Sequence, residues 1–298
     1  MKKIIIGTWP LSGDYGYIPL SQIYKTLSYS FENKFYEYDT APSYGNGFIE
    51  FILGNFFNGE KKIKFNTKVG NHPFFGKSFT LSDIEKSIEQ SLKRLKASKI
   101  NVLFLHNPRI QEKQLEKIII FLKNLKKDKI IKYTGISLPK NFELNNKILN
   151  HFDVIQDDAS LLSTNFTNYS LNKKQKFHGR SPFANGILTG SINKKFKKDD
   201  HRNDWLSSIM RKKIINLSIK RIKELSDYSL MDLAFKFVNF QSNINKNIFG
   251  VKNINHIKNL VRLTKLKRKK KDKLIFEQVI KLNSSCFYIE KKFQKYLY

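Results

Sequence analysis

The chain has 298 residues, 40% of them hydrophobic and 13% aromatic, which is enough apolar material for a large core and excludes a disordered protein. Its one cysteine excludes an intrachain disulfide and a cysteine-based metal site, and no apolar run reaches the roughly 20 residues of a membrane span. The formal net charge of +30 favours a nucleic-acid partner. However, only eight of the 55 basic residues are Arg, and the lysines are spread along the whole chain. Compositional bias therefore explains the charge better, and nucleic acid is not expected as a partner.

Short apolar runs alternate with longer amphipathic, Lys-rich segments, which is the pattern of βα units around a parallel sheet. The opening MKKIIIGTWP is interpreted as the first strand, because Asp14 comes too soon for the core of a signal peptide. Eight strands indicate a closed sheet, so the predicted fold is a single (β/α)8 TIM barrel, one domain over residues 1–298. The predicted strands are Lys3–Gly7, Lys34–Tyr38, Ile63–Asn66, Val102–Leu105, Lys132–Ile136, Val154–Gln156, Lys176–Gly179 and Asn247–Phe249.

Helix signals lie between these strands. One helix is expected to begin with Thr80 or Ser82 as its cap, and Glu85 would complete a capping box with Ser82. The segment between the sixth and seventh strands, residues 157–175, is short for a full helix. A basic helical tail is expected over about residues 265–298. Its dense run, KLKRKKKDK at 265–273, is either a solvated helix face or loop, or a weak contact for a membrane surface or nucleic acid.

Four polar residues fall at or just beyond the carboxyl ends of successive predicted strands. Asp39 follows the second strand, Lys68 the third and His106 the fourth, whereas Tyr44 lies on the loop after the second. All strand carboxyl ends meet at one mouth of such a barrel, where catalysis is found. Residues far apart in sequence are therefore expected to converge there.

The chemistry of these four side chains fits reduction of a carbonyl, because the carbonyl oxygen needs a proton when its carbon receives a hydride. A free tyrosine has a pKa of about 10, and a neighbouring ammonium lowers it. Lys68 can play this part if Asp39 holds it charged and in place. His106 can hydrogen-bond the carbonyl oxygen or share the proton transfer.

Each residue taken alone has a structural interpretation. Asp39 could cap a helix, Tyr44 beside two glycines could be a turn residue, and Lys68 could be a surface lysine. His106 could be a structural, hydrogen-bonded histidine. The catalytic interpretation depends on finding the four together at strand ends.

Several segments that contain these residues resemble motifs of the aldo-keto reductase family. They are DTAPSYGNGFIEFILG, TKVG, SLKRLKASKINVLFLHNP, KIIKYTGISL and SPFANGILTG, in order along the chain. The resemblance implies an NAD(P)H-dependent, commonly monomeric oxidoreductase that acts on an aldehyde, ketone or sugar-like carbonyl. The single cysteine fits a reducing, cytoplasmic compartment. It implies Tyr44 as the general acid, Lys68 and Asp39 as its activators, and His106 as the residue that orients the carbonyl.

The resemblance also implies a cofactor site built from the later strands, with no Gly-rich Rossmann loop. Ser137 and Gln156 match the positions that bind the nicotinamide amide, although strand-end capping is an equal alternative for both. Ser181, Phe183 and Gly186 match the loop over the pyrophosphate. Gly250 and Lys252 match the adenosine end, where Lys252 could meet a 2′-phosphate; NADPH is the expected cofactor, with NADH left open.

The sequence departs from the family in three places. Leu138 stands where Asn usually follows the fifth-strand Ser, and Asn259-Leu260 replaces the usual Glu-Asn pair. Asp157-Asp158 is an unusual acidic pair, either a helix cap or a site for a polyhydroxylated substrate. These departures keep open a second function for the same fold, a non-catalytic barrel that senses the cofactor or binds a partner.

The resemblance implies a substrate pocket lined by aromatic side chains from loops at the barrel mouth, in keeping with the mostly apolar lining of small-molecule sites. Four aromatic side chains on the loops at the predicted mouth are the candidates for its lining, with core packing as the alternative for each. They are Trp9, Tyr15, Phe74 and Phe75. No His, Asp and Glu cluster has metal-site spacing, so no metal is expected.

Overall fold

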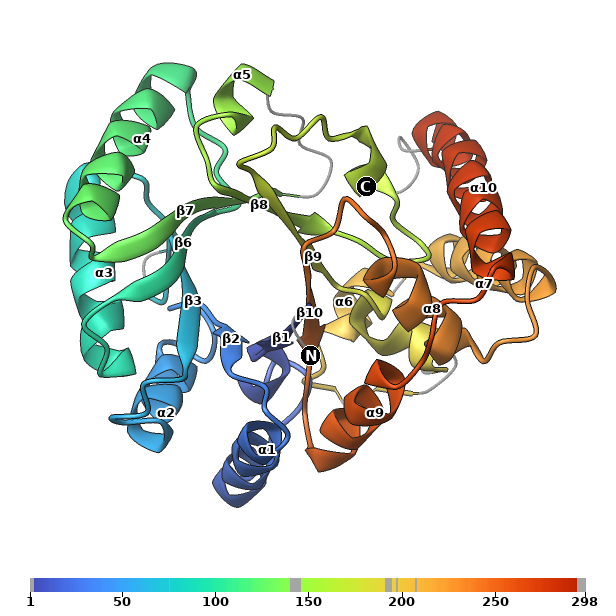
Figure 1. Cartoon of the computed structure of the whole chain (residues 1–298), viewed down its shortest axis with the longest axis horizontal. Helices are drawn as coiled ribbons and strands as arrows, with labels where there is room; N and C mark the ends of the chain where they lie inside the picture. Colours follow the sequence, from blue (N-terminus) through green and yellow to red (C-terminus); the bar gives the residue numbers. More distant parts are fainter. Residues whose placement is uncertain are drawn as a thin grey trace.

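Eight parallel strands close into a barrel in the spatial order β1-β10-β9-β8-β7-β6-β3-β2, and the predicted TIM barrel is confirmed (Figure 1). The computed structural model describes residues 3–74, 76–139, 146–190, 195–196, 198–206 and 208–293. All eight predicted segments form barrel strands. They are β1 (Ile4–Gly7), β2 (Glu37–Asp39), β3 (Lys64–Val69), β6 (Ile100–His106), β7 (Ile131–Ser137), β8 (Val154–Asp158), β9 (Lys176–Arg180) and β10 (Lys246–Gly250).

Helices surround the barrel and contribute buried apolar side chains to the core, and α10 lies farther out, packed against α8 (Figure 1). They are α1 (Leu20–Glu32), α2 (Phe48–Phe56), α3 (Leu81–Leu95), α4 (Glu112–Lys127), α5 (Asn146–Leu149), α6 (Arg202–Trp205), α7 (Ile209–Glu224), α8 (Leu230–Asn239), α9 (Ile254–Thr264) and α10 (Lys271–Phe293). After β3, a two-stranded hairpin, β4 (Asn71–His72) and β5 (Gly76–Lys77), is added. Of the expected tail, residues 294–298 lie outside the described residues.

Of the two predicted caps of α3, the structure confirms Thr80. Thr80 is the N-cap, and its hydroxyl oxygen accepts a hydrogen bond of 3.2 Å from the backbone N–H of Asp83. Ser82 is therefore already inside the helix, and the expected capping box of Ser82 with Glu85 is wrong. With Thr80 as the cap, the helix starts two residues earlier than it would with Ser82, and Asp83 in its first turn accepts a bond of 2.8 Å from the Thr80 hydroxyl.

The segment between β8 and β9 holds no α-helix, in line with its short length. A 3-10 turn, η2 (Asn165–Asn168), takes the place of the helix and buries Phe166 against the core. Tyr169, next in sequence, donates a hydrogen bond of 2.6 Å from its hydroxyl to Asp157. This short connection therefore brings a side-chain partner to the acidic pair at the end of β8.

The barrel interior is polar at both ends and apolar between them. At the amino-terminal end of the strands, Glu37 pairs with Lys246 and accepts a bond of 3.0 Å from Asn66. Val102, Phe104 and Val154 form a small apolar cluster in the middle, apart from the main core. Side chains alternate between the inside and the outside along a strand. The inward-facing residues nearer the carboxyl end than this cluster therefore lie at the barrel mouth.

His178 in the interior predicts a pH dependence of stability. Burial, together with the nearby cations Lys246 and Lys176, lowers its pKa to about 3. Its ring is 2% exposed and packs against Phe104. Below pH 6.5 the unfolded chain takes up a proton that the folded chain refuses, so stability falls as the pH drops, by about 2 kcal/mol for this group at pH 5.

The measurement is thermal unfolding of the wild type and of His178→Leu between pH 8 and pH 5. The variant is expected to lose less stability over this range, because it has one fewer group whose pKa is depressed on folding. His151→Asn is the matched control, since His151 lies on the surface. An equal loss of stability with falling pH in all three proteins would contradict the assignment of this effect to His178.

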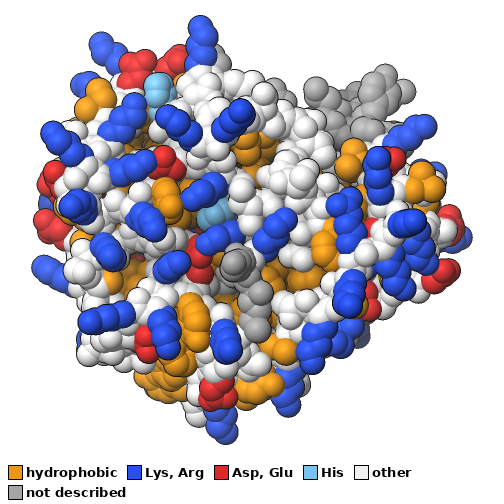
Figure 2. All heavy atoms as spheres, viewed as in Figure 1, with side chains coloured by type: hydrophobic (Ala, Val, Ile, Leu, Met, Phe, Trp, Pro, Cys, Tyr) orange, Lys and Arg blue, Asp and Glu red, His pale blue; other side chains and the backbone are white. Residues whose placement is uncertain are grey.

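The basic run after α9 is mostly a solvated loop that leads into α10. Residues 265 and 267–271 are exposed, whereas Asp272 is buried and pairs with Lys236 at 2.8 Å. Figure 2 shows Lys and Arg side chains over the whole visible face, with acidic side chains between them. Within the described part of the chain, no helix combines the length and apolarity needed to cross a membrane.

Candidate active site

Strand ends bring Asp39, Lys68 and Tyr44 into direct contact. The Lys68 ammonium donates to a carboxylate oxygen of Asp39 at 2.5 Å, to the backbone carbonyl of Thr40 at 2.8 Å and to the Tyr44 hydroxyl oxygen at 3.2 Å. Lys68 is 2% exposed and Asp39 4%. The three donors of one buried ammonium therefore have three oxygen partners, which fixes where the Tyr44 hydroxyl lies.

The loop between β2 and α2 aims Tyr44 into the mouth. Its tight turn depends on Gly45 and Gly47, whose φ values of 58° and 85° favour glycine. The Trp9 ring, in the 3-10 turn η1 (Trp9–Leu11) after β1, stacks on Tyr44 with centroids 6.2 Å apart. The His106 ring meets Tyr44 edge-on at 6.4 Å. The four residues predicted to act together thus lie together.

The electrostatics keep Tyr44 protonated and Lys68 charged. Burial raises the pKa of Tyr44, and the Lys68 ammonium opposes part of that rise. Burial alone would lower the pKa of Lys68, but the Asp39 carboxylate and Tyr44 outweigh it, so the pKa is raised. At neutral pH the site therefore holds a phenol next to an ammonium, which is the arrangement of a proton donor with its activator.

His106 is neutral in this setting. Burial lowers its pKa well below the usual range, and the cations Lys68, Arg180 and Lys77 lower it further. Its Nδ1 is buried without a hydrogen-bond partner among the described residues. A neutral imidazole carries one N–H, so His106 can donate a single hydrogen bond to a carbonyl oxygen without adding charge.

Ser137 and Gln156, predicted at the nicotinamide end, extend the network from Asp39. The Ser137 hydroxyl donates to the Gln156 side-chain carbonyl at 2.8 Å, and the Gln156 amide donates to the second carboxylate oxygen of Asp39 at 2.9 Å. Both residues are 1% exposed. Their contact with Asp39 was not predicted from the sequence.

Arg180, at the end of β9, is a site residue that the sequence analysis missed. Its guanidinium donates to the Ser137 hydroxyl oxygen at 2.9 Å, to the Leu138 carbonyl at 2.6 Å and to Asp158 at 2.9 Å. The predicted strand ended one residue too early, at Gly179, which hid the inward position that follows His178. The same strand-end rule that found Lys68 would have found Arg180.

The acidic pair Asp157-Asp158 is explained by Arg180. Asp158 binds the guanidinium directly, and a carboxylate oxygen of Asp157 lies 3.6 Å from it. No helix begins after the pair, so the helix-cap interpretation is wrong. The pair instead fixes the cation between β8 and β9.

The loop after β9, expected over a pyrophosphate, has a strained backbone. Ser181, Ala184 and Asn185 have φ values of 54°, 45° and 54°, and Gly186 follows at 88°. Such left-handed conformations in non-glycine residues cost energy and cluster at functional sites. A tight turn of this kind, in which Phe183 with negative φ precedes Ala184 with positive φ, can direct successive backbone N–H groups into a concavity suited to anions. Phe183 packs its ring on Phe249 and anchors the loop.

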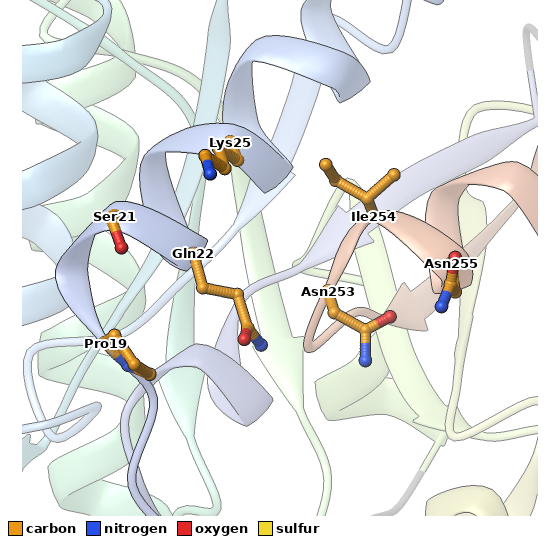
Figure 3. Close-up of a pocket in the computed structure, with 7 residues that line it drawn as sticks. All are labelled: Pro19, Ser21, Gln22, Lys25, Asn253, Ile254 and Asn255. Atoms are coloured by element: carbon orange, nitrogen blue, oxygen red, sulfur yellow. The ribbon is translucent and has the colours of Figure 1, made fainter.

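The residues predicted at the adenosine end lie after β10. A side chain at Gly250 would press on Pro10, because an added Cβ would lie 2.9 Å from its ring. The Lys252 ammonium donates to the backbone carbonyl of Tyr15. Next to them, a hollow of about 340 Å³ opens between α1 and α9 (Figure 3). Its lining is Pro19, Ser21, Gln22, Lys25, Asn253, Ile254 and Asn255.

The predicted pocket aromatics separate into two groups. Trp9 and Tyr15 contact each other edge-on at 5.1 Å, and Trp9 stacks on Tyr44, so this pair lies beside the candidate catalytic residues. Phe74 instead lies at the tip of the β4–β5 hairpin, 71% exposed, with its ring near His72. Phe75 lies outside the described residues. Among the described residues, no group of three or more His, Cys, Asp or Glu could hold a metal ion.

The model of the aldo/keto reductase family matches residues 3–280. The chain belongs to this family. Its members are oxidoreductases that act on carbonyl groups with nicotinamide cofactors, and the four converging residues lie within the matched range.

Two solved structures show the same fold. A glycerol dehydrogenase from Gluconobacter oxydans superimposes with a TM-score of 0.74 at 21% identity, covering 93% of this chain and 90% of that one. An aldo-keto reductase from Bacillus halodurans in its holo form gives a TM-score of 0.72 at 20% identity, covering 94% and 91%. At this identity the likeness concerns the fold alone.

Proposed function

We propose that this protein is an NAD(P)H-dependent reductase of a small aldehyde, ketone or sugar-like carbonyl, with Tyr44 as the proton donor. The observation that carries the proposal is the buried ammonium of Lys68, bonded at once to Asp39 and to the Tyr44 hydroxyl. A lone surface lysine would not make these contacts. A phenol held against a buried cation is suited to release its proton as negative charge develops on a nearby oxygen.

The proton balance follows from these contacts. The bound cofactor supplies a hydride to the carbonyl carbon. The Tyr44 O–H gives its proton to the carbonyl oxygen, and the phenolate that remains is stabilised by Lys68, whose charge is balanced by Asp39. His106 donates an N–H to the same oxygen and orients it. Because the His106 pKa is depressed, this donor stays neutral over the working pH range.

The residues present fit a nicotinamide cofactor at two places. Gln156 uses one amide N–H on Asp39 and one lone pair on Ser137, which leaves it one donor and one acceptor for a carboxamide. The strained turn at Ser181–Gly186 suits a pyrophosphate. The positive charge of Lys252 at the adenosine end favours binding of NADPH over NADH. Within this site, Ser137, Gln156, Ser181, Phe183, Gly186, Gly250 and Lys252 are the proposed cofactor-binding residues.

The substrate is proposed to be small and polar, with Trp9 and Tyr15 as the pocket wall. Trp9 stacks on Tyr44, so a ligand bound at the phenol would lie near its indole. The related structure from Gluconobacter oxydans is a glycerol dehydrogenase, which supports a short hydroxylated compound. The exposed Phe74 is the weaker pocket candidate.

The test is titration of the purified protein with NADPH and NADH by cofactor fluorescence, followed by turnover on a panel of aldehydes, ketones and reducing sugars. Binding with turnover is the expected result, with NADPH bound more tightly. If the preference arises from Lys252, Lys252→Met should weaken the affinity for NADPH and leave the affinity for NADH unchanged. Failure to bind either cofactor would overturn the proposal.

A second candidate is a non-catalytic barrel that senses the cofactor. Arg180 favours it, because the guanidinium takes up a lone pair of Ser137 and the Leu138 carbonyl near the expected nicotinamide. The intact contact between Lys68 and Tyr44 argues for catalysis instead. Tight cofactor binding without turnover of any compound on the panel would select the sensor.

A further inference from the structure

A single chain of hydrogen bonds crosses the barrel mouth from β9 to the catalytic tyrosine. Arg180 donates to Ser137 at 2.9 Å, Ser137 to Gln156 at 2.8 Å, and Gln156 to Asp39 at 2.9 Å. Asp39 accepts from Lys68 at 2.5 Å, and Lys68 donates to Tyr44 at 3.2 Å. The members come from five different strands and one loop, so only the folded barrel joins them.

The direction of every bond in this chain is set by its two ends. Arginine has donors and no acceptor, and an ionised carboxylate has acceptors and no donor. Because Arg180 occupies a lone pair of the Ser137 oxygen, the Ser137 hydrogen is directed to the Gln156 carbonyl. The Gln156 amide nitrogen then faces Asp39. A flipped Gln156 would put its carbonyl oxygen against the second carboxylate oxygen of Asp39, and neither of these two oxygens would have a donor from the other residue.

Arg180 is itself held rigidly in the donor role. Asp158 accepts from its Nε at 2.9 Å, the Leu138 carbonyl accepts from Nη2 at 2.6 Å, and Asp157 flanks it. Asp157 is fixed in turn by the Tyr169 hydroxyl at 2.6 Å. The guanidinium therefore has little freedom to turn away from Ser137 and contact a ligand.

We infer that Arg180 is a positioning residue that fixes the amide orientation of Gln156 through Ser137. This orientation steadies the Asp39–Lys68–Tyr44 unit. It also presents the donor and the acceptor of Gln156 to the nicotinamide carboxamide in one fixed order. The inference rests on the proposed function and adds a residue and a mechanism to it. It also explains the acidic pair Asp157-Asp158, which serves the cation and not the substrate.

The inference predicts two effects of Arg180→Met on the purified protein. The affinity for NADP⁺ should fall about tenfold, whereas that for 2′-phospho-ADP-ribose, which lacks the nicotinamide, should stay within about twofold of wild type. The kcat for carbonyl reduction should fall about tenfold or more, with KM for the carbonyl substrate little changed. Arg262→Met is the matched control, because that arginine pairs with Asp232 on the surface.

A double-mutant cycle with Ser137→Ala separates positioning from a direct role. Ser137→Ala breaks the chain without disturbing the ion pairs of Arg180, so it stays informative if Arg180→Met fails to fold. If Arg180 acts through Ser137, the double variant should lose about as much kcat and NADP⁺ affinity as the worse single variant. Losses that multiply, or equal losses of affinity for NADP⁺ and 2′-phospho-ADP-ribose, would overturn the inference.

A third variant tests the direction of the bonds. Gln156→Glu keeps the size of the side chain but removes the donor that faces Asp39, and it is expected to lose more activity than Gln156→Ala. The reverse order would contradict the fixed polarity. A wild type that binds no nicotinamide cofactor would instead overturn the proposed function, so the two failures are distinguishable.

Discussion

Tyr44→Phe is expected to lower kcat for carbonyl reduction by a factor of about 10²–10⁴, which is the usual contribution of a positioned general acid. The substitution removes only the hydroxyl that Lys68 contacts at 3.2 Å and keeps the ring that packs on Trp9. Affinity for NADPH should be unchanged, because the proposed role of the phenol is to protonate the substrate and not to hold the cofactor. Steady-state kinetics together with cofactor fluorescence measure both quantities.

Tyr38→Phe is the control for this variant. Tyr38 is a buried tyrosine on the same strand as Asp39, and its hydroxyl lies 2.6 Å from Ser30 outside the mouth. The control loses a buried hydroxyl and should cost stability but not kcat. Wild-type activity in Tyr44→Phe would withdraw Tyr44 as the proton donor, and an equal loss in both variants would indicate a general effect on folding.

Much of the barrel could be predicted from the sequence because its strands are short apolar runs with clear ends. The strand-end rule then placed Asp39, Lys68 and His106 at one mouth without any knowledge of their contacts. The position of Tyr44 depended on its loop, which the glycines on either side of Asn46 indicated. Here the sequence pattern predicts at which end of a strand a residue lies.

The contacts among site residues could not be predicted, because they depend on side chains from strands that are distant in sequence. Arg180 was hidden by an error of one residue at a strand end, and the bond from Gln156 to Asp39 joins residues 117 positions apart. The contact of the Lys252 ammonium with the Tyr15 carbonyl was likewise not predicted. Long, flexible side chains have many possible partners, and only the fold selects among them.

Lys68→Met is the second variant with a large expected effect, and it separates the roles of Lys68 in stability and in catalysis. It leaves Asp39 buried with Gln156 as its remaining side-chain donor. Removing one partner of a buried ion pair usually costs about 3–5 kcal/mol of folding stability. Without the cation, the phenolate left by proton transfer is no longer stabilised, so kcat should fall by about the same 10²–10⁴ as for Tyr44→Phe.

The double variant Asp39→Asn/Lys68→Met tests whether the loss of activity in Lys68→Met is caused by its loss of stability. It removes both charges, so no unpaired ion remains in the interior, and a buried pair replaced by neutral groups is often tolerated. We expect chemical denaturation to show most of the lost stability restored, while kcat stays at the level of Lys68→Met. Activity that returned with stability would mean that Lys68 supports the fold alone, and Tyr44 would then need another source for the stabilisation of its phenolate.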